Sequence, residues 1–126
     1  MPPPYPLPPS HLLLFLSTTS LLFTAATTTL LTGPSMQPTY SNCGDIVLVD
    51  KLFWKMSGLK VGDIVIATPS PNKQVCKRVS KPPEPLPKGS LWLLGDNLSQ
   101  SRDSRDYGTI DESKIVGRVV AKLWGW

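Results

Sequence analysis

The first 44 residues of this 126-residue chain contain no Asp, Glu, Lys or Arg, and every charged residue lies from Asp45 onward. The chain also has only two Cys and one His, which excludes a disulfide framework and the usual Cys/His zinc site. Its net charge of +4 comes from Lys and Arg that are scattered rather than clustered. The composition therefore gives no support to nucleic-acid binding.

An uncharged apolar segment precedes the charged part of the chain. Residues 1–11 are rich in proline and are expected to form an extended lead. Residues 12–31 follow as 20 residues without a charge, Gly or Pro, which is about the length that a helix needs to cross a bilayer. We therefore predict a single transmembrane anchor over 12–31. A secretory signal peptide and a mitochondrial presequence are the alternatives, but both normally carry basic residues that this segment lacks.

The remainder of the chain, residues 33–126, is expected to form one small, mainly β domain. Fourteen Pro and nine Gly argue against a helical bundle and favour short strands joined by turns. Runs of β-branched and apolar residues bounded by turn residues predict strands over 45–50, 63–68, 74–79, 90–94 and 115–123. Residues 81–88 (KPPEPLPK) hold too many prolines for a paired strand, so we expect them to form a surface connection.

Ser35 is a candidate nucleophile in the sequence Gly33-Pro34-Ser35-Met36-Gln37-Pro38-Thr39. The two prolines constrain the backbone on both sides of the serine, and Gly33 would allow another part of the chain to approach closely. The same residues are also typical of an ordinary turn at the exit from a membrane segment. Ser35 alone therefore does not establish a site.

Lys77 is the candidate base for Ser35. In a strand it would share one face with Val75 and Val79, and burial between them would lower the pKa of its ammonium group. The alternative is an exposed lysine on an edge strand. The only His, at position 11, precedes the predicted membrane segment, which leaves Ser-Lys as the nucleophile–base pair with positional support.

A third segment, residues 95–108 (GDNLSQSRDSRDYG), has the composition of a structured polar loop. Calcium binding is disfavoured because basic residues are interleaved with the acidic ones. Together the three segments resemble the type I signal peptidase family of membrane-anchored Ser-Lys proteases. That family carries a Ser-Met box, a Lys-Arg box and a Gly-Asp-Asn…Ser-x-Asp-Ser-Arg box in this order, and the wording here is most similar to its mitochondrial inner membrane members.

The resemblance implies a small, largely antiparallel β domain of the signal peptidase type behind one N-terminal membrane helix. It implies no cofactor and no metal. The site residues that it implies are the nucleophile Ser35, the general base Lys77, and the supporting residues Ser101, Asp103, Arg105, Gly33 and Met36. In the family, the residue matched by Ser101 hydrogen-bonds to the lysine, and the Asp-Arg pair supports the site. Some bacterial members have a serine at the position of Gly33, whose hydroxyl helps to bind the oxyanion.

The function implied is removal of targeting segments from precursor proteins sorted to the mitochondrial intermembrane space. The enzyme would lie in the inner membrane, with a second peptidase subunit as partner. One departure concerns residues 80–89, where a short bridge replaces a Gly-x-x-Gly-Asp turn and an insert.

This bridge leaves three readings open: a minimal active enzyme, an incorrectly spliced product, and a non-catalytic membrane-tethered paralogue that scaffolds an active subunit. A bacterial-type or chloroplast signal peptidase is a further alternative. Cys43 and Cys76 are interpreted as two free, partly buried thiols, and a disulfide between them stays an alternative.

Overall fold

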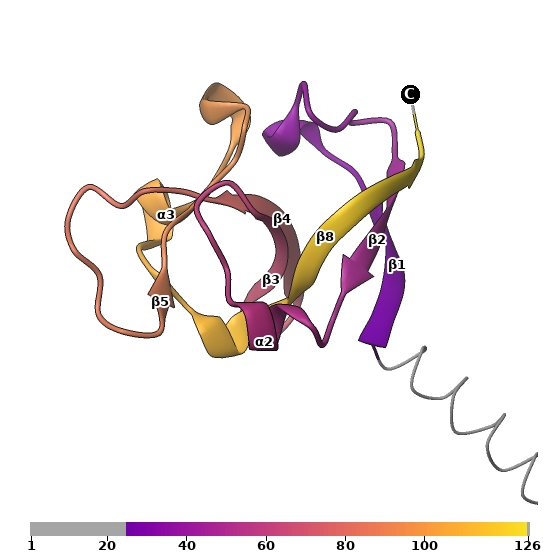
Figure 1. The fold of residues 1–126 in the computed structure, drawn as a ribbon. Coiled ribbons are helices and arrows are strands. Elements are labelled where there is room, and N and C mark those ends of the chain that lie inside the picture. Colours follow the sequence, from indigo (N-terminus) through magenta and orange to yellow (C-terminus); the bar gives the residue numbers. More distant parts are fainter. Residues whose placement is uncertain (1–24, 126) are drawn as a thin grey trace, which may run out of the picture.

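The computed structural model describes residues 25–125, which form a curled β-sheet with short helical turns (Figure 1). The main sheet has six strands in the order β1-β2-β8-β3-β4-β6, and all neighbouring strands are antiparallel. Their bounds are β1 Ala26–Leu31, β2 Asp45–Asp50, β3 Ile64–Ser70, β4 Lys73–Val79, β6 Leu93–Leu94 and β8 Ile115–Trp124. The expectation of a mainly β, largely antiparallel domain is confirmed.

The other elements are short. A second sheet pairs β5 (Ser90–Leu91) with β7 (Ile110–Asp111). The helices are α2 (Trp54–Ser57) and α3 (Ser104–Tyr107), and the 3-10 turns are η1 (Pro34–Met36), η2 (Leu98–Gln100) and η3 (Glu112–Lys114). Over residues 25–125, no helix is long and apolar enough to cross a membrane.

Four of the five predicted strands agree with observed strands to within two residues at each end. The fifth, over 90–94, is wrong as a single strand. It divides into β5 and β6, which pair with β7 and β4 respectively. An apolar run has the same sequence pattern whether it pairs with one neighbour or changes partner midway, so the sequence does not show the division. Residues 81–88 have no regular secondary structure and are mostly exposed, as predicted.

The predicted anchor over 12–31 overlaps the folded domain. Its last six residues, Ala26–Leu31, form β1, which pairs with β2 along its whole length. The predicted end of the membrane helix at Leu31 is therefore wrong. Three consecutive threonines in this segment are β-branched, and such residues favour an extended chain that packs on a neighbouring strand. Residues 12–24 of that prediction and the lead 1–11 lie outside the described residues.

Two apolar clusters lie on the two faces of the sheet. The first consists of Trp54, Val65, Ala67, Val79, Leu93, Ile110 and Ile115. The second consists of Leu31, Met36, Tyr40, Val47, Val49 and Ile66. Val65 and Ile66 are consecutive in β3 but belong to different clusters, because successive side chains of a strand point to opposite faces. The central strand β3 is thus buried on both sides, which makes it the rigid support for β4 beside it.

The two ends of the molecule carry different features (Figure 1). At one end, β1 leads into η1, and the loop that contains η2 lies beside it. At the other end lie α2 and the beginning of β1. The three sequence motifs meet at the first of these ends.

Candidate functional site

Ser35 is the middle residue of η1, directly after β1. Gly33 has a φ of 94°, a backbone conformation that L side chains rarely adopt. A Cβ built on Gly33 would meet no atom within 4 Å, so the expectation that Gly33 permits another part of the chain to approach closely is wrong. Glycine is favoured at this position because of its positive φ. The side chain of Met36 is 4% exposed and packs in the second apolar cluster, which fixes η1 against the sheet. The peptide bond between Gln37 and Pro38 is cis.

Lys77 is buried in β4, with 4% of its surface exposed. Val75 and Val79 pack on the first apolar cluster, whereas Cys76 packs on the second, so the predicted alternation is confirmed. Burial lowers the pKa of the Lys77 ammonium from its ordinary value, and the carboxylate of Asp103 acts in the opposite direction. A lowered pKa increases the fraction of neutral amine that can accept a proton near neutral pH.

A cavity of about 180 Å³ lies between the end of β1 and the edge of β4. Ser35 and Lys77 both line it. The other lining residues come mainly from these two strands and the turn after η1: Thr29, Leu30, Leu31, Thr32, Gly33, Met36, Tyr40, Ser41, Ile66, Gln74, Val75 and Cys76. The fold therefore brings the candidate nucleophile and the candidate base to one cavity.

The beginning of the 95–108 loop is bonded to η1. The backbone N–H of Asn97 donates to the carbonyl oxygen of Ser35 at 2.8 Å, and the side-chain amide of Asn97 donates to that of Pro34 at 3.1 Å. Gly95 lies so close that a Cβ built on it would be 2.6 Å from the Ser35 carbonyl oxygen and would overlap the side chain of Ser101. A residue without a side chain is therefore required where Ser35 and Ser101 approach each other.

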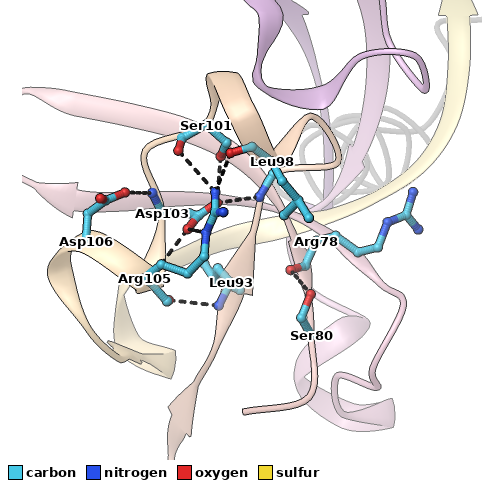
Figure 2. Close-up of polar contacts among 10 residues, drawn as sticks. Arg78, Ser80, Leu93, Leu98, Ser101, Asp103, Arg105 and Asp106 are labelled. Carbon is cyan, nitrogen blue, oxygen red and sulfur yellow. Dashed lines mark hydrogen bonds and ion pairs between the residues drawn. The ribbon is translucent and has the colours of Figure 1, made fainter. Parts of the chain in front are cut away.

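Asp103 is fully buried at the centre of a hydrogen-bond network (Figure 2). Its Oδ2 accepts from the Gly95 N–H at 2.9 Å and from the Ser101 hydroxyl at 2.7 Å. The Arg105 guanidinium donates to Oδ1 through Nε at 2.9 Å and to Oδ2 through Nη2 at 3.1 Å. Burial alone would raise the pKa of the Asp103 carboxyl, but the bonds from Arg105, Gly95 and Ser101 hold it well below its usual range. Asp103 therefore stays ionised and fixes the groups around it.

The same carboxylate begins helix α3. Asp103 is the N-cap and accepts from the Arg105 N–H, while Asp106 accepts from the Asp103 N–H at 3.0 Å, which completes a capping box. The Ser104 hydroxyl oxygen accepts from the Leu93 N–H at 2.9 Å and joins the helix to β6. These bonds make the predicted supporting pair, Asp103 and Arg105, a rigid part of the fold.

Ser101 has a different hydrogen-bond partner from the one that the resemblance implied. Its hydroxyl donates to Asp103, and among residues 25–125 no hydrogen bond joins it to Lys77. A hydroxyl that donates its proton keeps lone pairs that accept from an ammonium group. Orientation of Lys77 by Ser101 therefore stays a prediction.

A second ion pair at this site was not selected from the sequence. Asp96 accepts from Nε and Nη2 of Arg78, both at 2.8 Å, and from the hydroxyl of Thr39. These bonds lower the pKa of the Asp96 carboxyl, with the Arg78 bond as the largest cause. Arg78 thereby joins β4 to the 95–108 loop, and Thr39 joins the chain after η1 to the same carboxylate. Opposite charges inside two separate motifs are the signal that could have identified this pair.

Both cysteines are free thiols; Cys76 is half-buried as interpreted, whereas Cys43 is exposed. Loss of solvent around Cys76 raises the pKa of its thiol to about 12. In the described part of the chain, no three His, Cys, Asp or Glu side chains are grouped as a metal site would require.

Comparisons with known proteins agree with the motifs. A family model described as signal peptidase, peptidase S26, matches residues 9–84 and 75–124. Mitochondrial inner membrane protease subunit 1 of Schizosaccharomyces pombe is 40% identical over 109 residues, which cover 73% of this chain and 69% of that protein. The human subunit 1 is 42% identical over 110 residues, 73% of this chain and 66% of that protein. Subunit 2 of Saccharomyces cerevisiae is 32% identical over 114 residues, 73% of this chain and 64% of that protein. The chain thus spans about two thirds of the length of these relatives.

Proposed function

The chain belongs to the signal peptidase family, peptidase S26, and on this premise we propose that it is a serine endopeptidase of the mitochondrial inner membrane. It removes targeting segments from precursor proteins sorted to the intermembrane space, and its catalytic domain faces that space. Its catalytic residues are Ser35 and Lys77. The names of its relatives support the reaction class and the location.

The observation that carries this proposal is the shared cavity of Ser35 and Lys77. A serine hydroxyl is a weak nucleophile until a neighbouring base removes its proton. Lys77 suits this role because its burial favours the neutral amine. Lys77 takes the proton as Ser35 attacks the scissile carbonyl, and later donates it to the leaving amine. The Ser35 N–H donates to the oxyanion that develops.

Strand edges beside the cavity can bind an extended substrate segment. β1 is an edge strand with β2 as its one partner in the main sheet, and β6 pairs with β4 only at Arg78 and Val79. Thr29–Leu31 of β1 and Gln74–Lys77 of β4 line the cavity from its two sides. An extended segment that enters between them can use strand-type hydrogen bonds, which are largely independent of side-chain identity. Such binding suits an enzyme that processes several precursors.

A second peptidase subunit is the proposed partner. Relatives of this chain carry the names subunit 1 and subunit 2 of the mitochondrial inner membrane protease, and names of this kind indicate a multi-subunit enzyme. The competing proposal is a non-catalytic paralogue that scaffolds an active subunit, which the short bridge over 80–89 favours. The two proposals differ in whether this chain cleaves.

The deciding experiment incubates the full-length membrane-embedded protein with a precursor substrate. We expect Ser35→Ala and Lys77→Ala each to abolish cleavage, and the double variant to be no worse, because the two residues act as one unit. Lys77→Arg should also be inactive, since a guanidinium keeps its proton. Ser99→Ala replaces an exposed serine of η2, in the 95–108 loop; it is the matched control and should retain activity. Cleavage by Ser35→Ala would establish that the activity belongs to another chain.

A further inference from the structure

Asn97 joins the 95–108 loop to both peptide groups that flank Ser35. Its backbone N–H donates to the carbonyl oxygen of Ser35 at 2.8 Å, and its side-chain Nδ2 donates to the carbonyl oxygen of Pro34 at 3.1 Å. The proposed function uses one of these two peptide groups, the one between Pro34 and Ser35, because its N–H donates to the oxyanion. The side chain of Asn97 is therefore bonded to the same peptide group that stabilises the transition state.

The bond from the Asn97 side chain fixes the direction of the Ser35 N–H. A peptide group is planar and trans, so its C=O and N–H bonds point in opposite directions. Because Nδ2 of Asn97 holds the Pro34 oxygen on the side of the 95–108 loop, the Ser35 N–H points away from that loop. Ser35 lines the cavity, whereas Pro34 and Asn97 do not. The Ser35 N–H is thus directed to the side on which a bound substrate would lie.

The Ser35 N–H has no acceptor within the described part of the protein. Ser35 is the second residue of η1, and the first N–H groups of a helix have no acceptor inside that helix. Among residues 25–125, no hydrogen bond has this N–H as its donor. Gly33 has no side chain, so it adds no second donor at the start of η1. Within η1, stabilisation of the oxyanion therefore depends on the direction of this one N–H.

The Pro34 carbonyl oxygen accepts two hydrogen bonds. Besides Nδ2 of Asn97, the backbone N–H of Gln37 donates to it at 3.1 Å. Hydrogen bonds in a chain polarise one another, so a peptide group whose oxygen accepts two bonds has a stronger N–H donor. The amide of Asn97 is itself oriented by the hydroxyl of Ser99, which donates to Oδ1 at 3.2 Å. Ser99 is exposed, so water can replace that hydroxyl when Ser99 is changed to alanine.

We propose that Asn97 is a positioning residue for the oxyanion donor: its side chain holds the peptide group between Pro34 and Ser35 so that the Ser35 N–H faces the oxyanion. The inference rests on the proposed function, in which Ser35 attacks the scissile carbonyl. Removal of an oxyanion donor lowers kcat about a hundredfold to a thousandfold. Loss of the Asn97 bond leaves the donor in place but misdirected, and Gln37 still holds the Pro34 oxygen. We therefore expect a smaller loss, of about tenfold.

The test compares Asn97→Leu and Asn97→Asp with the parent, each as the full-length membrane-embedded protein. Both variants lack the Nδ2 donor but keep the backbone N–H of residue 97, so the bond to the Ser35 carbonyl oxygen is retained. The substrates are a short peptide ester and the matching thionoester, in which sulfur replaces the oxygen of the scissile carbonyl. Because sulfur is a weak hydrogen-bond acceptor, the ratio of the two kcat/KM values measures the contribution of the oxyanion donors.

We expect kcat/KM of both variants to fall about tenfold on the ester, mainly through kcat, and to change little on the thionoester. The ratio of ester to thionoester should therefore fall about tenfold as well. Asn72→Leu removes an exposed side-chain amide from the turn between β3 and β4; it is the matched control and should keep the parent's ratio. A purely structural role of Asn97 would lower both kcat/KM values by the same factor and leave their ratio unchanged.

Partial unfolding of a variant does not affect this test, because both substrates are cleaved by the same folded fraction. An unchanged ratio in the two Asn97 variants, or an equal fall in Asn72→Leu, would overturn the proposal. If the parent cleaves the ester while the Asn97 variants keep its ratio, only the role of Asn97 is refuted and the proposed function stands. If the parent cleaves neither substrate, the proposed function itself fails, and the role of Asn97 fails with it.

Discussion

Replacement of Gly95 by alanine is the substitution whose effect the structure determines most directly. A Cβ at this position would lie 2.6 Å from the Ser35 carbonyl oxygen, whereas ordinary carbon contacts lie at about 3.5 Å. The Ser35 backbone, or the loop that carries Gly95, must therefore move by about 0.9 Å. The same Cβ would overlap the side chain of Ser101 more severely, and that side chain is held by its hydrogen bond to Asp103. The added methyl group thus displaces both the backbone of the candidate nucleophile and the side chain of Ser101.

The expected loss of activity follows from this displacement. A misplacement of about 1 Å in a catalytic group can lower the rate about a hundredfold. We expect kcat/KM of Gly95→Ala on a peptide substrate to fall by about that factor, mostly through kcat. Insertion of one methyl group into a packed region should also lower the free energy of unfolding by about 1 to 3 kcal/mol. Urea denaturation followed by tryptophan fluorescence measures that second effect.

Gly117 in β8 provides the matched control. A Cβ on Gly117 would be 2.5 Å from Cγ1 of Val49, and, as at Gly95, its φ is not positive. Gly117→Ala should therefore destabilise the fold to a similar degree while the folded fraction keeps its kcat. If Gly95→Ala retains the kcat/KM of the parent, or if Gly117→Ala loses as much kcat per folded molecule, then Gly95 does not position the nucleophile and the reasoning is refuted.

Three further predictions concern titrating groups. Val75→Asp places a carboxylate beside Lys77 and so raises the pKa of its ammonium group. The rise of kcat/KM with pH, which follows the loss of the Lys77 proton, should therefore move to higher pH, whereas Val75→Leu should leave it in place. The Asp103 carboxyl has a lowered pKa in the fold, so it stabilises the protein above its unfolded pKa of about 3.9 and this contribution is lost as pH falls below it. Asp103→Asn should reduce the urea-measured stability at neutral pH by about 2 kcal/mol and weaken its dependence on acid, and an unchanged acid limb would contradict this. At neutral pH iodoacetamide should modify Cys43 quickly and Cys76 slowly, because the pKa of Cys76 is raised to about 12; equal rates on mass spectrometry would show that Cys76 is not desolvated.

The longer strands could be predicted from sequence because burial on one or both faces leaves a regular pattern. β2 and β4 show β-branched runs bounded by turn residues, and their predicted limits agree closely with the observed ones. β5 and β7 contain two residues each, and their pairing depends on which chain segments lie nearby rather than on their own composition. An uncharged, Thr-rich segment is compatible both with the end of a membrane helix and with a strand, so its composition does not distinguish β1 from a continued helix.

The sequence indicates two of the residues that belong to the site, but not which residues of the site contact each other. Ser35 stands out because prolines constrain the backbone on both sides of it, and Lys77 because it lies between Val75 and Val79 on one face of a predicted strand. The fold places both residues in one cavity. Gly95 was not selected, since a glycine in a polar loop usually indicates a turn with positive φ, whereas here the reason is the proximity of Ser35 and Ser101. The role of Asn97 cannot be predicted from the sequence either, because its hydrogen bonds are to backbone carbonyl oxygens, which every residue has.

The charges around Lys77 act on its pKa in opposite directions, which leaves burial as the main reason that this pKa is lowered. Asp103 raises the pKa of Lys77, and this effect opposes catalysis by a neutral amine. Arg105, which binds both oxygens of Asp103, lowers it. The carboxylate therefore acts on the lysine as part of an ion pair, and the field of a pair falls off faster than that of a single charge. Asp103 can therefore remain ionised and hold Ser101 without keeping Lys77 protonated. One carboxylate fixes the 95–108 loop, and the pKa of Lys77 is still lowered because burial is the largest influence on it.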